Sequence, residues 1–223
     1  VLSSFSKHHA LKIAEILPPI SRPGELFEYL RGPWIEEVGD EQYSLSPLLD
    51  RIGEEIWSPE ILKKYHFLIV DAMISSRDLS NRNFMALFTH ALRGGNNKAI
   101  CILIASLMNS PKIVWKAVSK EMSWMISIKK KEDIKRIVED DTANCMIRFF
   151  QFRMASEIDH EAATLLAETW INETQIHQPI EAYISERFMM IGEILSRYNV
   201  EIPIRTMIEL LKEGEDIYQK TKS

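Results

Sequence analysis

The sequence predicts a mostly α-helical protein in which one short β-hairpin precedes a long series of helices. Two observations predict this class. Apolar residues recur at the helical period of 3.6 along the chain after Pro47. Before it, two short strand-like runs flank Gly39-Asp40, a common hairpin turn. We therefore expect the sheet to be a hairpin over about Trp34–Leu45, and no strand of four or more residues beyond residue 60.

Two short helices are expected before the hairpin, and prolines mark their boundaries. Pro18-Pro19 stops the first helix, and Pro23, at a first-turn position, opens the second. Ser46-Pro47 then restarts a helix after the hairpin, with Ser46 as its N-cap. The predicted elements are helices His8–Leu17 and Pro23–Leu30, strands Trp34–Val38 and Gln42–Leu45, and a helix from Ser46.

A series of helices follows from Ser58-Pro59, which repeats this N-cap and proline start. Glycine, proline or paired acidic residues separate the helices. Helix pairs recur about every 30–45 residues, a spacing typical of helical-repeat proteins. A compact irregular helical bundle is the alternative. The predicted helices are one from Pro59 through Met73, then Asn81–Arg93, Asn97–Met108, Lys112–Ile126, Glu132–Glu139, Thr142–Ser156, His160–Asn172, Pro179–Tyr198 and Pro203–Gln219.

The N-terminal segment also resembles a known family. A short helix, a tight break, a hairpin and a new helix start form the back half of a winged helix. Residues 5–53 resemble the winged-helix module of STAND-class signal-transduction P-loop ATPases, the NB-ARC-like regulators, particularly the bacterial ones. The residues that carry the resemblance are Ala14-Glu15-Ile16-Leu17, Arg22-Pro23-Gly24-Glu25-Leu26, Gly32-Pro33-Trp34-Ile35 and Tyr43-Ser44-Leu45-Ser46-Pro47-Leu48-Leu49.

This resemblance implies an organisation and a setting. In the family an ATPase domain precedes the winged helix, and superhelical repeats follow it. Residues 1–57 would then be the C-terminal part of a winged helix with a connecting helix, and residues 58–223 an α-helical repeat domain. The ATPase domain would be absent from this chain, and the missing initiator Met suggests an excised fragment.

The resemblance also points to one candidate site residue. Many family members carry a Met-His-Asp motif where the last strand meets the next helix, and its His touches the bound diphosphate. Here Leu45-Ser46-Pro47 stands in that place, so Ser46 occupies the His position. A Ser hydroxyl donates to a phosphate but carries no positive charge. Ser46 is therefore a nucleotide-sensor candidate only with an upstream ATPase domain, whereas an N-cap role needs no ligand.

Catalytic and metal-binding motifs are missing from the sequence. No Gly-x-x-x-x-Gly-Lys-Ser/Thr phosphate loop occurs, so we expect no cofactor in this fragment, with ATP or ADP possible only in a longer protein. The Gly94-Gly95 loop lacks that spacing and is explained by glycines that end one helix and an Asn that caps the next. Asp159-His160-Glu161 begins like a zinc-protease helix, but Thr164 stands where the second His belongs. Asp159 is better explained as an N-cap. We therefore expect neither catalytic residues nor a metal site.

Charge and composition restrict the partners. The net charge is −5, and residues 22–45 hold two basic side chains against six acidic ones, which opposes DNA binding. The one basic cluster, Lys129-Lys130-Lys131 with Lys135 and Arg136, fits a solvated helix junction better than a binding site. No apolar run reaches the roughly 18 residues that span a bilayer. Cys101 and Cys145 lie in apolar helical stretches, which suggests reduced thiols in a cytoplasmic protein.

Three functions remain. The favoured one is a non-catalytic regulatory fragment of a signal-transduction NTPase, whose helical repeats bind protein partners and which binds neither nucleic acid nor membrane. The alternatives are a helical-bundle enzyme with a site assembled from distant residues, and a nucleic-acid-binding winged-helix regulator. We also expect Leu48, Leu49, Ile52 and Ile56 to pack between the two parts of the chain, with Trp57 largely buried.

Overall fold

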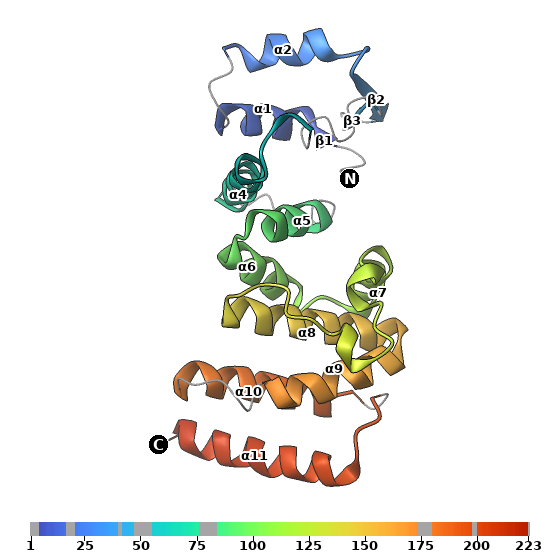
Figure 1. Cartoon of the computed structure of the whole chain (residues 1–223), viewed down its shortest axis with the longest axis vertical. Helices are drawn as coiled ribbons and strands as arrows, with labels where there is room; N and C mark the ends of the chain where they lie inside the picture. Colours follow the sequence, from blue (N-terminus) through green and yellow to red (C-terminus); the bar gives the residue numbers. More distant parts are fainter. Residues whose placement is uncertain are drawn as a thin grey trace. The chain divides into compact units, whose positions relative to one another are not determined.

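A computed structural model describes residues 5–16, 21–39, 42–46, 55–75, 84–173, 180–197 and 200–222. Its elements follow one another as Figure 1 shows, and they confirm a mostly α-helical class with a short antiparallel hairpin near the N-terminus. The chain divides into two compact units, residues 1–103 and 104–223. We describe each unit by itself. The predicted division after residue 57 is a finer one within the first unit and stays a prediction.

The first unit begins with two helices and a sheet. The helices are α1 (Lys7–Ile16) and α2 (Pro23–Leu30), and the strands are β1 (Phe5–Ser6), β2 (Ile35–Gly39) and β3 (Gln42–Leu45). The sheet is antiparallel with the order β1-β3-β2, and Ile35 pairs with Leu45 in the hairpin. β1 adds a two-residue strand that the sequence prediction lacks, because two residues carry no alternation.

A small apolar core holds α2 against the hairpin. Phe27, Ile35 and Tyr43 are buried, and Leu11 of α1 packs against them. The rings of Phe27 and Tyr43 meet edge to face with their centroids 5.0 Å apart, a favoured aromatic geometry. Of the apolar positions of α2, Phe27 is buried in this core and Leu30 packs against it, whereas Leu26 is 39% exposed.

The first unit continues with α4 (Pro59–Ser75) and α5 (Phe84–Gly94), which pack against each other, and with the start of α6 (Asn97–Leu107). A Cβ atom on Gly94 would lie 2.5 Å from the backbone nitrogen of Phe67, so only glycine allows this approach of the helices. Gly95 follows with φ 64°, and the Asn96 side chain then accepts the N–H of Ala99 at 3.0 Å. The interpretation of this loop as a helix end and an N-cap is confirmed.

The described part of the second unit contains helices joined by irregular chain. Its elements are α7 (Lys112–Glu121), the short 3-10 helices η2 (Ser123–Ile126) and η3 (Lys131–Asp133), α8 (Asp141–Ile158), α9 (His160–Glu173), α10 (Ile180–Leu195) and α11 (Ile204–Lys222). α8 packs against α7 and α9, and α10 packs against α11 (Figure 1). Phe149, Phe150 and Phe152 of α8 are all buried, so this helix meets neighbours on several faces.

Two helix predictions in this unit are wrong in part. The predicted helix Glu132–Glu139 is only the 3-10 turn η3 followed by irregular chain. The Asp133 carboxylate accepts the N–H groups of Lys129 and Lys130, at 3.0 and 3.1 Å, and such local bonds compete with a helix. The predicted helix Lys112–Ile126 is broken at Met122, where α7 ends and η2 begins.

The predicted junction after the hairpin is also wrong where it can be checked. Ile56 is 68% exposed and Trp57 is exposed as well, so neither is enclosed between two parts of the chain. Instead the Trp57 ring meets Tyr65 of α4 edge to face, 5.0 Å between centroids. The remaining residues of that prediction, Leu48, Leu49 and Ile52, lie outside the described residues.

Candidate functional site

Ser46, the predicted nucleotide-sensor position, follows β3 directly. It is buried, and its backbone N–H donates to the carbonyl of Trp34 at 2.8 Å, which extends the hairpin pairing by one bond. The predicted start of the helix that it was expected to cap falls on residues outside the described ranges. The sensor role of Ser46 therefore stays a prediction.

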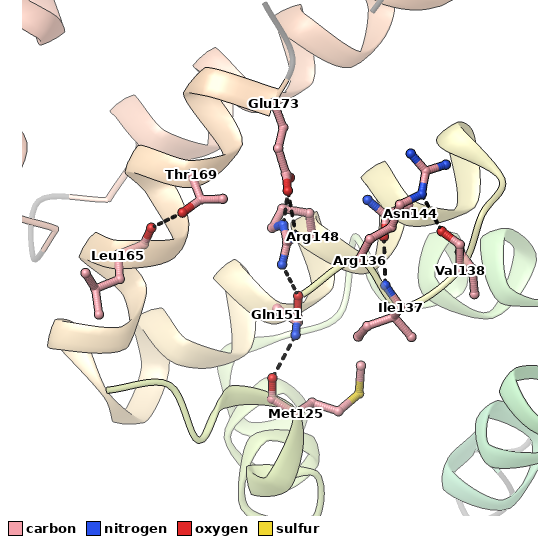
Figure 2. A network of polar contacts seen from close by, with 10 residues as sticks. All are labelled: Met125, Arg136, Ile137, Val138, Asn144, Arg148, Gln151, Leu165, Thr169 and Glu173. Carbon is pink, nitrogen blue, oxygen red and sulfur yellow. Dashed lines mark hydrogen bonds and ion pairs between the residues drawn. The ribbon is translucent and has the colours of Figure 1, made fainter. Parts of the chain in front are cut away.

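The other segments singled out in the sequence have structural roles. Asp159 accepts the N–H of Ala162 at 3.0 Å, so its interpretation as the N-cap of α9 is confirmed. In the basic cluster, Lys131 forms an ion pair with Glu168 of α9 at 2.6 Å. Arg136 is held by the carboxylate of Asp141 at 2.6 Å. It also donates to the carbonyl of Val138 at 2.8 Å, as Figure 2 shows.

The second unit contains a small polar cavity. Its volume is about 70 Å³, enough for water or a small ion and too little for an organic substrate. Side chains from α8, α9, α10 and the segment before α8 form its wall. They are Arg136, Asp141, Asn144, Cys145, Trp170, Glu173 and Glu186.

The chemistry of this wall opposes nucleophilic catalysis. Burial and, to a smaller extent, the nearby carboxylates of Glu186 and Glu173 raise the pKa of the Cys145 thiol to about 12. A thiol must ionise to attack a substrate, so this one is inert at neutral pH. Asn144 is occupied as well, because its side-chain oxygen accepts the N–H of Ile137 at 3.2 Å (Figure 2).

Glu173 of the cavity wall binds a buried arginine that links several elements (Figure 2). Arg148 of α8 is 1% exposed, and its Nε and Nη2 atoms donate to the two carboxylate oxygens of Glu173, at 2.9 and 2.8 Å. Its Nη1 atom donates to Gln151 at 2.8 Å, and Gln151 in turn donates to the carbonyl of Met125 in η2, also at 2.8 Å. One guanidinium therefore connects α8 to α9 and, through Gln151, to η2.

The next helix pair repeats this arrangement. Arg187 of α10 is also 1% exposed, and it donates through Nε and Nη2 to both oxygens of Glu213 in α11, at 2.6 and 2.8 Å. Its Nη1 atom donates to the backbone carbonyl of Ile171, at the end of α9, at 2.7 Å. We call these two arrangements the arginine clamps: Arg148 with Glu173, and Arg187 with Glu213.

The sequence predicts helix pairs about every 30–45 residues, and the clamps identify residues that correspond in two of these pairs, which sequence reasoning missed. The paired residues are 25 apart in the first clamp and 26 apart in the second, and Arg187 follows Arg148 by 39 residues. The only local signal is an Arg-Phe step within each of two apolar helices, at Arg148-Phe149 and Arg187-Phe188. The helix pairs α8–α9 and α10–α11 are therefore two copies of one unit with a period of about 40 residues.

The C-terminal helix presents a different kind of surface. One face of α11 is buried at Leu210 and Ile217, whereas large apolar side chains on another face are exposed. The positions of these side chains, separated by four, three and seven residues, place them along one side of the helix. They form what we call the α11 stripe: Ile204, Ile208, Leu211 and Tyr218.

Three further findings concern similar proteins, metal binding and membrane spans. Comparisons of the chain with protein-family profiles, with curated proteins and with solved structures gave no match. Among the described residues, no group of three or more His, Cys, Asp or Glu side chains is placed to hold a metal ion. No helix in the described part of the chain combines the length and hydropathy that crossing a bilayer requires.

Proposed function

We propose that this chain is a non-catalytic protein-interaction scaffold, the winged-helix and helical-repeat region of a regulatory NTPase of the STAND class. The observation that carries the scaffold role is the α11 stripe, because a series of large exposed apolar side chains on one helix marks a binding surface. The order of α1, α2, β2 and β3 in the first unit supports the winged-helix part of the proposal.

The use of charge in the second unit favours a scaffold over an enzyme. Both buried arginines are committed to a carboxylate and a further acceptor, so their charge stabilises the helix pairs. The buried thiol of Cys145 is held in its neutral form. An active site needs ionisable groups that are still available to a substrate, and these groups already have structural partners.

The charge of the first unit favours a protein partner over DNA. Arg22 forms an ion pair with Glu25 at 3.2 Å, and Arg31 pairs with both Glu28 and Glu37. The two basic side chains between residues 22 and 45 are thus neutralised within the molecule. A DNA-binding surface needs such groups to be directed at phosphates.

Site-specific photocrosslinking tests the scaffold role. A photoreactive phenylalanine analogue would replace Leu211 in the α11 stripe, and Ile113 of α7, which is also exposed, would be the matched control position. We expect a protein adduct of defined mass from position 211 in cells that make the full protein, and none from position 113. Equal labelling at both positions, or none at 211, would contradict the proposal.

A further inference from the structure

We propose that the α11 stripe binds an amphipathic helix of a partner protein, with a basic residue of that helix opposite Glu215. This inference rests on the proposed scaffold function and specifies its partner. It depends on three features of the second unit: the two faces of α11, the correspondence of α11 with α9, and the position of one exposed carboxylate.

α11 has one buried and one largely exposed apolar face. On the buried face, Gly214 faces α10, and a Cβ atom there would be in ordinary contact with Ile191 at 3.4 Å. The exposed face carries the α11 stripe, and its Ile204 is 76% exposed. A helix whose apolar residues extend around more than one side is typical of a helix packed between two neighbours.

The arginine clamps fix which residues of α9 and α11 correspond. Because Glu213 takes the place of Glu173, 40 residues on, Ile204 corresponds to Thr164 and Leu211 to Ile171. On α9 these positions bond to α10 and to the connection between α10 and α11. The Thr164 hydroxyl accepts the N–H of Glu201 at 3.3 Å, and the Ile171 carbonyl accepts from Arg187 at 2.7 Å.

Ile204 and Leu211 of the α11 stripe therefore correspond to the positions at which α9 meets the next repeat, whereas Ile208 corresponds to Glu168, which pairs with Lys131. Ile171 is 8% exposed where α10 covers it, whereas the corresponding Leu211 is 58% exposed. At Thr164 and Ile171, α9 bonds to residues of the next repeat, and helices pack on helices through ridges with the same spacing as this stripe. The occupant that fits is thus a helix with apolar residues at intervals of three and four.

The charge of the stripe specifies the partner further. Glu215 is exposed and follows Leu211 by one turn on the same side of α11. A purely apolar helix or a lipid tail would have to bury this carboxylate without a counter-charge, which is costly. A lysine or arginine in the partner removes that cost by pairing with the carboxylate. Within this unit Arg187 of α10 does so for Glu213, while it also binds the Ile171 carbonyl of α9.

Synthetic peptides of about 18 residues, or five helical turns, are the probes. The first carries leucines at helical spacing flanked by lysines, the second has the same composition in scrambled order, and the third replaces lysine by glutamate. Fluorescence anisotropy would measure their binding to the whole chain. We expect binding of the first peptide only, with the glutamate peptide at least about tenfold weaker.

Matched variants locate the binding site. Ile204 and Ile113 are both 76% exposed, on α11 and α7, so neither substitution disturbs a core. Ile204→Ser and Leu211→Ser should each weaken binding of the lysine peptide about tenfold or more, and Ile113→Ser should leave it unchanged. Glu215→Gln should reduce the preference for lysine over glutamate peptide. Circular dichroism would check that each variant is folded.

Several outcomes overturn the proposal. Binding of the scrambled peptide as tightly as the first would remove the requirement for a helix. Loss of binding in Ile113→Ser but not in Ile204→Ser would place the site elsewhere. A dimer in sedimentation that Leu211→Ser dissociates would show that a second copy covers the stripe. If the photocrosslink at Leu211 captures a protein while no peptide binds, the scaffold function stands and the helical partner is wrong.

Discussion

The two units differ in the partners of their buried or partly buried ionisable side chains. In the second unit each buried arginine meets both oxygens of a carboxylate and one further acceptor. In the first unit, His66 of α4 and His90 of α5 face each other with their Nδ1 atoms 2.6 Å apart. The arginine clamps hold a permanent charge with its counter-charge, whereas the histidine pair accommodates one proton between its nitrogens and resists a second. The first arrangement should be insensitive to pH between about 6.5 and 4, and the second should not.

The largest effect is expected from removing a clamped arginine. Arg187→Leu leaves the Glu213 carboxylate partly buried without its cation and the Ile171 carbonyl without its donor. Losing one partner of a buried ion pair typically costs about 3–5 kcal/mol. Urea unfolding followed by circular dichroism would measure the loss. A cost below about 1 kcal/mol would show that the clamp contributes little to stability and would weaken the contrast with the histidine pair.

The histidine pair should make stability depend on pH. Burial, followed by the charges of His66 and Arg93, lowers the pKa of His90 to about 4, below its ordinary value of about 6.5. The folded state then binds fewer protons than the unfolded state. This contribution is fully present above about pH 6.5 and is lost as the pH falls towards 4, by up to about 3 kcal/mol.

The variant His90→Gln separates the contribution of His90 to the free energy of unfolding from that of carboxylates that titrate in the same pH range. We expect the stability of the variant to fall less steeply than that of the wild type between pH 6.5 and 4.5, in urea unfolding at matched ionic strength. Parallel curves for the two proteins would mean that His90 accepts its proton in the folded state as readily as in the unfolded one.

A smaller effect is expected where a carboxylate meets backbone rather than a cation. Asp159→Ala removes the acceptor for the N–H of Ala162 at the start of α9. Loss of such an N-cap typically costs about 1 kcal/mol. The unfolding midpoint in urea should fall accordingly, and Asp159→Ser should restore most of it. No recovery with Ser would point to the charge of Asp159 rather than to its hydrogen bond.

The smallest effect is expected from an exposed ion pair. Arg205 and Glu209 lie one turn apart on α11, 3.0 Å between Nε and Oε1, and the arginine is almost fully exposed. Arg205→Ala should change stability by no more than about 0.5 kcal/mol, because water screens the pair. This variant is therefore the matched control for Arg187→Leu. Comparable losses in the two would contradict the importance assigned to burial.

Prediction from sequence succeeded where a feature depends on residues close to one another in the chain. α2 and β3 begin and end at the predicted residues, because a proline and a turn fix them locally. The N-cap roles of Asp159 and Asn96 were predicted for the same reason. Each depends on residues within one turn of the chain.

The failures depend on contacts that the local pattern does not contain. The irregular segment after η3 replaces a predicted helix because Asp133 bonds to the backbone before it and Arg136 bonds to carbonyls after it. The clamps join residues 25 and 26 apart, well beyond helical periodicity. The exposure of the α11 stripe was equally hidden, because an apolar position in a helix has the same appearance in the sequence whether or not a neighbour covers it.

The position of Arg187 has a consequence for how the chain is completed during synthesis. α9 leaves the ribosome before α10, so the carbonyl of Ile171 has no arginine to meet until residue 187 has been added. Arg187 in turn has no carboxylate until Glu213 follows. In a nascent chain that ends after α9, the carbonyl of Ile171 therefore lacks its donor. In one that ends after α10, the charge of Arg187 lacks its carboxylate partner. We expect ribosome-bound intermediates of this region to become resistant to protease only once α11 has emerged.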